Sequence, residues 1–542
     1  MTLTDSLGFR HKGQFAMATD VTETEDRNLR LSMLLEKKRR YEEKRNKLAI
    51  KMEQLDCKIT ETQADYGTIY NREIPILKLP TEVACIIFYY ASGYPNEGDG
   101  ESGRHLLIEV VISHVCHRWR SISIDYPWLW ARFCFDGPNA TRFPLDRLEA
   151  YLERSGTQKL ELWFDFCGTR NGPGRGSTGV TGVNYFILLE KAILHVSRWY
   201  RVTINSDAET PITPVTSSLE SSSAPNLVHF AFCPDILQVG ENEGVESLEP
   251  TIFKGGAPKL RSLMIDSSSA LVCLPPLSNV TILRIEAGEN NMEYLFPWST
   301  FYNILTLPAL TGLSIVGNIF QTPENSITPI KMPSLRHLRY SDNELLARVL
   351  PKLRGPLLES LVIQNARFPE RYSAFRAPPY VFPSLQCLCL IQTTTSSPRS
   401  AWYFAQMTRS ITHAIFSHDS YVQSIFYMLL NGPDGDKKYW PKLERLTFNL
   451  PIGDEVSDAL RFVQARPSDA LVLEVFDQIR DQWRASDLNS YKSIMKASKL
   501  EIMDSNDDSL WRAYWPPGEE DEVDLTMDSD PFDIPASNFY LF

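Results

Sequence analysis

A short phrase built on Pro and Leu recurs along most of the chain, and it constrains the fold more than any other feature. Clear copies begin at Ala257 (APKLRSLMI), Met332 (MPSLRHL), Phe382 (FPSLQCLCL) and Trp440 (WPKLERLTF). In the pattern P-x-L-x-x-L-x-apolar, the first Leu falls at the turn into an extended segment. The second Leu and the apolar residue that follows share one face, since side chains alternate along a strand. Each phrase therefore predicts one short strand with an inward apolar face.

The phrases follow one another from about Leu160 to Phe476, mostly about 20 to 40 residues apart. This arrangement resembles leucine-rich repeats, in which each repeat supplies one parallel strand and returns by a helix or loop. The resemblance implies a curved solenoid with a parallel inner sheet over residues 145–480. The coils are expected to be irregular, because the usual Asn position is not consistently filled. The alternative is an ordinary α/β domain with a parallel sheet.

A long helix is predicted over residues 26–66, where strong helix formers dominate and neither Pro nor Gly occurs before Gly67. The preceding residues, 1–25, are polar and mixed and are expected to be disordered. With Leu31 as an a position, the d positions of a heptad are Leu34, Tyr41, Leu48 and Leu55, and the remaining a positions are Lys38, Arg45, Met52 and Ile59. This stripe predicts a coiled-coil seam that forms a homodimer or packs on the chain's own body. The two charged a residues leave a solvated single helix as the alternative.

A short and densely apolar segment from Ile74 to Trp130 predicts three helices. Apolar residues of the first helix fall at helical spacing on one face, and they are Leu79, Val83, Ile86, Ile87 and Tyr90. A Gly-rich acidic loop follows, and a second helix is expected with Leu107, Val111, Val115, Trp119 and Ile122 on one face. So small a unit is marginal on its own. Its surplus apolar surface predicts a covering partner, either another protein or the repeat region behind it.

Three motifs of this segment, in order, resemble the signature blocks of an F-box. They are Leu79-Pro80-Thr-Glu, Val115-Cys116-His-Arg-Trp119, and Pro127-Trp-Leu129-Trp130. The resemblance identifies residues 73–132 as an F-box-like domain, with a longer loop than usual between its first two helices. It implies docking on the Skp-family adaptor of a cullin ubiquitin ligase. The residues that would form or support the docking face are Leu79, Pro80, Ile86, Ile87, Val115, Cys116, Trp119, Leu129 and Trp130.

Net charge and hydropathy restrict the remaining function classes. The net charge of −12 and the isoelectric point near 5.4 argue against nucleic-acid binding, which needs a basic surface. Much of the excess acid lies in the tail 516–542, which is expected to be disordered after a helical segment over 481–515.

No apolar leader or stretch of about 18 apolar residues occurs, so neither secretion nor a membrane is expected. The cytoplasm or the nucleus is the expected location. The basic run Lys37–Arg40 favours a charged helix face over a nuclear-import signal.

No recognisable catalytic or metal-binding motif occurs, so a non-enzymatic adaptor without cofactors is expected. The Gly-rich stretch 168–182 lacks the G-K-[ST] of a phosphate-binding loop and favours a flexible insertion. Cys387 and Cys389 favour buried thiols over a soft-metal site. In the leading hypothesis the repeats bind an unidentified target protein and the helices connect it to the ligase. The alternatives are a ligase-independent scaffold that uses the repeats and the N-terminal helix, and a nucleotide-binding enzyme that uses the Gly-rich stretch.

Overall fold

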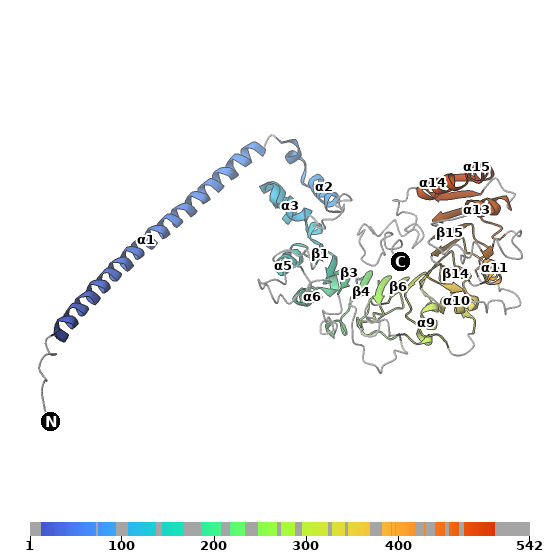
Figure 1. Ribbon diagram of the computed structural model, residues 1–542, viewed down its shortest axis with the longest axis horizontal. Coiled ribbons are helices and arrows are strands. Elements are labelled where there is room, and N and C mark those ends of the chain that lie inside the picture. The colour runs from blue at the N-terminus through green and yellow to red at the C-terminus, as the bar shows by residue number, and fades with distance from the viewer. Residues whose placement is uncertain are drawn as a thin grey trace, which may run out of the picture. The chain divides into compact units, whose positions relative to one another are not determined.

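The computed structural model shows a mixed α/β chain with a long N-terminal helix and a large parallel sheet (Figure 1). It divides into two compact units, Met1–Ile86 with Ile112–Ile122, and Ile87–Val111 with Ser123–Phe542. The structure describes residues 12–71, 74–93, 107–136, 144–166, 186–206, 217–233, 248–267, 273–287, 295–323, 328–341, 345–368, 382–391, 393–395, 397–417, 428–429, 439–449, 455–465 and 471–503.

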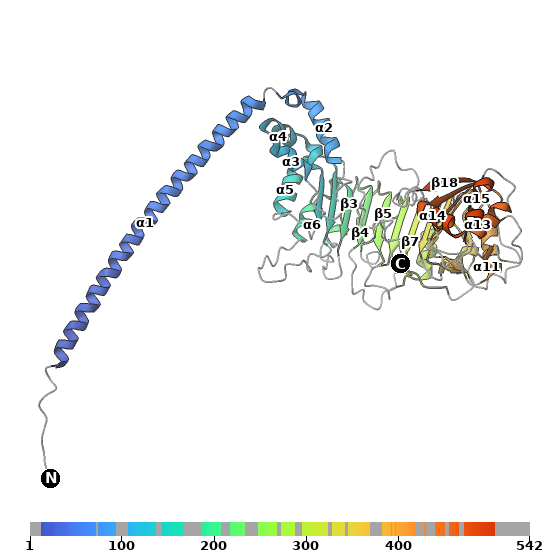
Figure 2. The same cartoon turned by 45° about the horizontal axis from the view of Figure 1, so that its top comes forward.

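The first unit contains the long helix α1, which spans Lys12–Asn71 (Figure 2). The helix is longer than the 26–66 expected from the sequence. It begins inside the stretch expected to be disordered and continues through Gly67 for another turn. Ion pairs at helical spacing support it, and Glu36 contacts both Arg39 and Arg40 at about 3 Å.

The short helices after α1 are a 3-10 turn η1 (Pro75–Lys78), α2 (Thr81–Gly93), α3 (Ile108–Val115), α4 (His117–Ile124) and a second 3-10 turn η2 (Pro127–Trp130). The single second helix expected from the sequence is therefore two helices, separated at Cys116. The Cys116 thiol accepts a hydrogen bond from the amide of Trp119 at 3.4 Å, and its carbonyl accepts one from the amide of Arg120 at 2.9 Å. Cys116 thus takes the place of an N-cap at the start of α4.

The second unit contains one fourteen-stranded sheet, in which every neighbouring pair is parallel and the strand order follows the chain. Its strands are β1 (Arg132–Asp136), β2 (Leu160–Asp165), β3 (Trp199–Asn205), β4 (His229–Cys233), β5 (Ser262–Asp266), β6 (Ile282–Glu286), β7 (Gly312–Val316), β9 (His337–Ser341), β11 (Ser360–Gln364), β13 (Cys387–Ile391), β15 (His413–Ser417), β16 (Arg445–Asn449), β17 (Val472–Phe476) and β18 (Lys499–Met503). A doubly wound α/β sheet would reverse its strand order at one point. The unbroken order is instead that of a solenoid-like fold.

The core of this sheet comes from two rows of apolar side chains that run across the strands in register. With the rows numbered along β1, the second row is buried and apolar from β1 to β17, and its members are Phe133, Leu162, Val202, Phe230, Leu263, Leu283, Leu313, Leu338, Leu361, Leu388, Ala414, Leu446 and Leu473. The fourth row is also apolar and contains the aromatic residues Phe135, Phe164, Phe232, Tyr340 and Phe416. The first, third and fifth rows lie on the opposite face of the sheet, because strand side chains alternate.

The Pro-Leu phrases form tight turns that lead into the strands. The amide of Leu260 donates to the carbonyl of Ala257 at 3.1 Å, and the amide of Leu443 donates to that of Trp440 at 3.0 Å. Pro fits the second position of such a turn because its ring fixes φ. Successive turns are also linked by side chains, since Ser334 donates to the Pro308 carbonyl and Ser384 to that of Pro356. These hydroxyl contacts join neighbouring coils.

Helices return the chain between strands, and α9, α10 and α11 lie on the outer side of the curved sheet (Figure 1). The helices of this unit are α5 (Pro144–Arg154), α6 (Phe186–Ile193), α9 (Trp298–Leu305), α10 (Leu345–Val349), α11 (Pro398–Met407), α13 (Glu455–Gln464), α14 (Asp477–Ser486) and α15 (Leu488–Ala497). Further 3-10 turns are η3 (Val196–Arg198) and η4 (Leu350–Lys352). Two small parallel pairs join β8 (Ile330–Lys331) to β10 (Leu353–Arg354) and β12 (Arg367–Phe368) to β14 (Thr394–Thr395).

The sheet extends beyond the repeat region expected at 145–480. It begins with β1 directly after the short helices and ends with β18, inside the segment expected to be only helical. Strand β18 pairs with β17 over its whole length, from Val472↔Lys499 to Phe476↔Met503. The segment after residue 480 is therefore a further coil of the same sheet, as far as residue 503.

Some sequence expectations fall outside the described residues, namely those for 1–11, the loop 94–106, the Gly-rich stretch 168–182 and the tail from 504 onward. Among the described residues, no helix is both long and apolar enough to cross a membrane.

We expect Leu358→Ala to lower the free energy of unfolding by about 2–5 kcal/mol, because the side chain is fully buried and its loss leaves a cavity. The adjacent Leu357 is 41% exposed and supplies a matched control, for which Leu357→Ala should stay within about 0.5–1 kcal/mol. Urea unfolding followed by circular dichroism measures both. Equal losses would show that the phrase Leu does not anchor the turn in the core.

Candidate functional site

Helix α2 is apolar on both sides, but only one side is covered. Phe88 is 1% exposed and Ala84 is also buried. The face on which the sequence places Val83, Ile86, Ile87 and Tyr90 is the open one, with Ile86 at 55% exposed and the other three also exposed. The helix therefore presents large branched apolar side chains to solvent.

Helix α3 shows the same division. Ile112 is buried, whereas Val111 and Val115 are exposed, the latter at 53%. The sequence had placed Val111 and Val115 on one face with Trp119. In the structure the break at Cys116 changes the direction of the chain, so Trp119 and Cys116 are half-buried while Val115 remains open.

The first two signature motifs meet within the first unit. The Arg118 guanidinium, in the second motif, donates a hydrogen bond to the backbone carbonyl of Leu79, in the first. Leu79 is half-buried and Pro80 is exposed. This bond holds the start of α2 beside the start of α4, although the two are 39 residues apart in sequence.

The third motif belongs to the second unit, and its two residues that the sequence assigns to the docking face or its support are buried. Leu129 is 4% and Trp130 1% exposed. The Trp130 indole donates to the Ser123 carbonyl at 2.6 Å, and its ring packs edge-on against Tyr151 with centroids 5.2 Å apart. The Arg154 guanidinium lies 4.4 Å from the same ring. Leu129 and Trp130 are thus structural supports, whereas Pro80, Ile86, Ile87 and Val115 are open to contact.

A buried acid lies beside this support. The Tyr151 hydroxyl donates a hydrogen bond to the carboxylate of Glu109. Burial raises the pKa of Glu109, although the Tyr151 bond and the charge of Arg147 act against it. The pair links α3 to α5 within the second unit.

The concave face of the sheet, formed by its first, third and fifth rows, has a repeated pairing of His with a hydroxyl on the next strand. Its members are His229 with Ser262 at 3.0 Å, His337 with Ser360 at 2.9 Å, and His413 with Thr447 at 2.9 Å. Burial lowers the pKa of His337, and burial with the nearby Arg201 charge lowers the pKa of His229 to about 3. These two rings are therefore neutral near pH 7 and act as hydrogen-bonding groups.

The accessible part of the concave face lies toward its ends. In the middle, Arg284 and Arg339 are buried, and Arg284 pairs with Glu286. Ala231, Cys233 and Met264 form a buried apolar cluster on the same face. Toward the first strands, Arg132 pairs with Glu161 at 2.9 Å and both remain partly exposed.

At the other end of the concave face, Glu474 is the centre of a charged cluster. It accepts hydrogen bonds from Arg445 and Thr447, and His413 lies 3.6 Å away. Burial raises the pKa of Glu474, but these three neighbours outweigh burial and lower it to about 2. Arg445 is 44% exposed on its side chain and also contacts Glu501. The cluster joins three strands and leaves one cation accessible.

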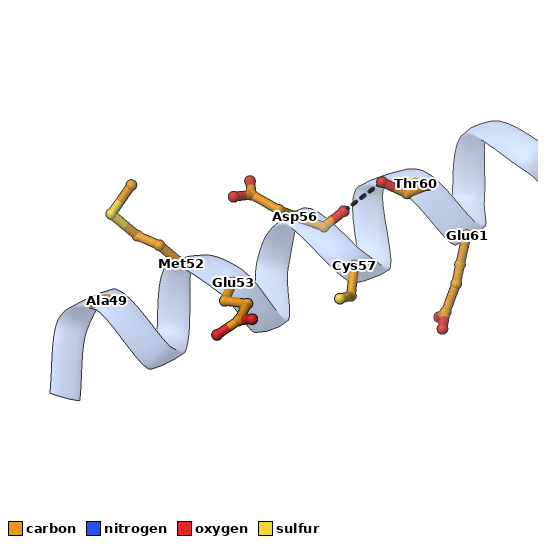
Figure 3. A pocket seen from close by; sticks show the side chains of 7 residues that line it. All are labelled: Ala49, Met52, Glu53, Asp56, Cys57, Thr60 and Glu61. Carbon is orange, nitrogen blue, oxygen red and sulfur yellow. Dashed lines mark hydrogen bonds between the residues drawn. The ribbon is translucent and has the colours of Figure 1, made fainter. Parts of the chain in front are cut away.

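The described residues include both members of the Cys387 and Cys389 pair. They contain no cluster of three or more His, Cys, Asp or Glu that could hold a metal ion. Burial raises the pKa of the Cys387 thiol to about 12, so this candidate soft-metal ligand is protonated. A groove on α1, lined by Ala49, Met52, Glu53, Asp56, Cys57, Thr60 and Glu61, lies along one helix and is open to solvent (Figure 3).

No model of a known protein family matches this chain, and no curated protein matches it.

We expect Glu474→Gln to destabilise the sheet most at neutral pH, by on the order of 2–3 kcal/mol, because the folded carboxyl has a pKa well below its unfolded value. A lowered acid pKa adds stability above the unfolded pKa, near 4.5, and that stability is lost as the pH falls toward 2. The difference between wild type and variant should therefore shrink between pH 5 and pH 3 in denaturant titrations.

The exposed Glu444, on the turn before β16, supplies the control. Glu444→Gln should leave the pH dependence of unfolding unchanged. A wild-type-minus-Glu474→Gln difference that stays constant from pH 7 to pH 3 would contradict the role given to the Glu474 cluster.

Proposed function

We propose that this chain is the substrate-recognition subunit of a Skp–cullin–F-box ubiquitin ligase. The observation that carries the proposal is the open apolar surface of the first unit, here called the docking patch, made of Pro80, Val83, Ile86 and Val115. Pro80, Ile86 and Val115 occupy positions where the F-box resemblance expects contact with the Skp-family adaptor. Ile87 is also exposed, and it belongs to the second unit.

The exposed patch has a physical cost that a partner would remove. Each large aliphatic side chain moved from water into an interface contributes roughly 1.5–3 kcal/mol. Scattered apolar residues are normal on a surface, but gathered ones indicate interaction sites. Leu79, Cys116 and Trp119 are half-buried, so in this function they support the patch from below.

Leu129 and Trp130 support the F-box module in a different way. Both side chains are buried, and the packing of Trp130 against Tyr151 and Arg154 ties the third motif to the first coil of the repeats. In the proposed receptor they hold η2 against the first helix and strands of the second unit.

The repeat region acts as an irregular leucine-rich-repeat solenoid that recognises the target protein. The sequential parallel sheet supports this assignment, as do the Pro-Leu turns. The partly exposed charges at the ends of the concave face, such as Arg132 and Arg445, are the groups available to a polar target surface. The neutral His rings offer hydrogen bonds without charge.

No residue of this chain needs to perform chemistry in this role. A receptor that holds a target lysine near a charged conjugating enzyme makes the transfer nearly intramolecular. The protein is accordingly a non-catalytic adaptor that needs no cofactor and assembles with the cullin core in the cytoplasm or nucleus.

A second candidate is a ligase-independent scaffold that uses the sheet and α1. The specific observation in its favour is that α1 exposes large apolar residues over most of its length, and these are not part of the F-box resemblance. Such a scaffold would function without the adaptor.

We expect a Skp-family adaptor to co-purify with the wild-type chain, and the variant Ile86→Asp with Val115→Asp to lose it by at least tenfold. Both positions are more than half exposed, so these changes should leave the fold intact. Leu79→Ala with Trp119→Ala should also lose the adaptor, through loss of the support beneath the patch. Pull-down with purified adaptor, with circular dichroism of each variant, measures the effect.

Leu194→Asp is the matched control, since Leu194 is 78% exposed, lies on the second unit and belongs to none of the three motifs. It should bind the adaptor as the wild type does. Binding that survives unchanged in the folded Ile86→Asp, Val115→Asp variant would exclude the docking patch as the adaptor site.

A further inference from the structure

The heptad stripe of α1 is open along its whole length. Its members Leu34 and Leu48 are each 62% exposed, and Tyr41, Met52, Leu55 and Ile59 are all above 50%. Isolated helices draw little stability from propensity alone and normally pack one apolar face. The stripe therefore calls for a partner with a matching helical surface.

The residues beside the stripe define what that partner is. The g positions of the heptad are all lysines, namely Lys37, Lys44, Lys51 and Lys58. The e positions include the acids Glu42 and Asp56, with Ala49 between them and Gln63 after them. In a coiled coil the residues at e and g face the neighbouring helix and set its identity and direction.

The charges favour a second copy of the same helix in parallel. In a parallel, in-register pair each g residue faces the e residue five positions later on the other helix. Lys37 then faces Glu42 of the second copy, and Lys51 faces Asp56 of the second copy, while the other two lysines face Ala49 and Gln63. In an antiparallel pair g residues face g residues, so lysine would face lysine in every register.

The two charged residues in the stripe fit a two-stranded arrangement. Lys38 and Arg45 occupy a positions, where a polar residue lowers stability but helps to set the number of strands. Their long stems can cover the seam while the charged ends reach water. Lys38 also lies 3.8 Å from Glu42 on its own helix, so its charge points toward the edge of the seam.

We infer that two copies of this chain pair through residues 31–62 of α1 as a parallel, in-register, two-stranded coiled coil. The inference rests on the exposed stripe and its flanking charges, and it is independent of the proposed ligase function. Parallel pairing brings the two Asn71 ends to the same end of the coil, so two recognition surfaces belong to one assembly. A target with two binding sites would then be held by avidity.

The first test is the mass of the full-length protein by size-exclusion chromatography with light scattering. The wild type should have twice the mass of one chain, and Leu48→Asp with Leu55→Asp should have the mass of a single chain. Ile50→Asp is the control, because Ile50 is equally exposed, at 56%, but occupies an f position away from the seam. It should remain dimeric.

The second test measures direction by disulfide formation under mild oxidation, in a Cys57→Ser background. Leu34→Cys and Leu55→Cys, introduced separately, should each give a covalent dimer, because a d residue faces its own copy in a parallel pair. No antiparallel register places both residues against their own copies. The native Cys57, at an f position, should not cross-link in the wild type.

Several results would overturn the inference. These are a wild type with the mass of one or three chains, a dimer that persists in the double Asp variant, or a cross-link at only one of the two d positions. Adaptor binding by the monomeric variant tests the ligase proposal separately. Loss of the dimer with retained adaptor binding would leave the proposed function intact.

Discussion

The structure depends on two rows of apolar side chains that stay in register across the parallel sheet. Each strand is only about five residues long, so a slip of one residue would turn both rows to the opposite face and expose the core. Where a Pro-Leu phrase precedes the strand, its turn Leu, such as Leu260 or Leu385, is also fully buried and sets where the strand begins. The face that carries these two rows is committed to packing. Polar strand residues such as Arg284 and Glu474 therefore lie on the opposite, concave face.

The strands could be predicted from sequence wherever the Pro-Leu phrase precedes them, because turn and alternation are both local. The parallel sheet followed from the spacing of the phrases. Strands β1 and β18 were not predicted, because their sequences RFCFD and KLEIM have no Pro-Leu phrase before them. Their pairing with β2 and β17 is decided by neighbouring strands rather than by their own residues. The break at Cys116 was also missed, because a thiol is a rare cap.

The candidate site was predictable as a set of residues but not as a surface. The sequence placed nine side chains on one docking face, and the structure divides them by exposure. Trp130 is buried because Tyr151 and Arg154 lie beside it, and neither contact can be read from the motif itself. Periodicity could identify the apolar stripe of α2, but it could not tell that Phe88 and Ala84 on the other side would be the packed pair. The sequence did contain a signal for the His pairs of the concave face. His229, His337 and His413 each stand one position before the buried second row of the sheet.

The docking patch, the ends of the concave face and the stripe on α1 differ in chemistry, so each suits a different kind of partner. The docking patch is aliphatic and carries little charge, so its binding should depend weakly on salt. The accessible ends of the concave face are polar, with cations such as Arg445 held by buried carboxylates, which gives specificity through charge and hydrogen bonding. The stripe on α1 combines apolar and charged groups. Its apolar seam would supply affinity, and the lysines and acids beside the seam would favour a second copy in the parallel direction. In the proposed assembly, the adaptor, the target and the second copy would each bind a surface of different chemistry.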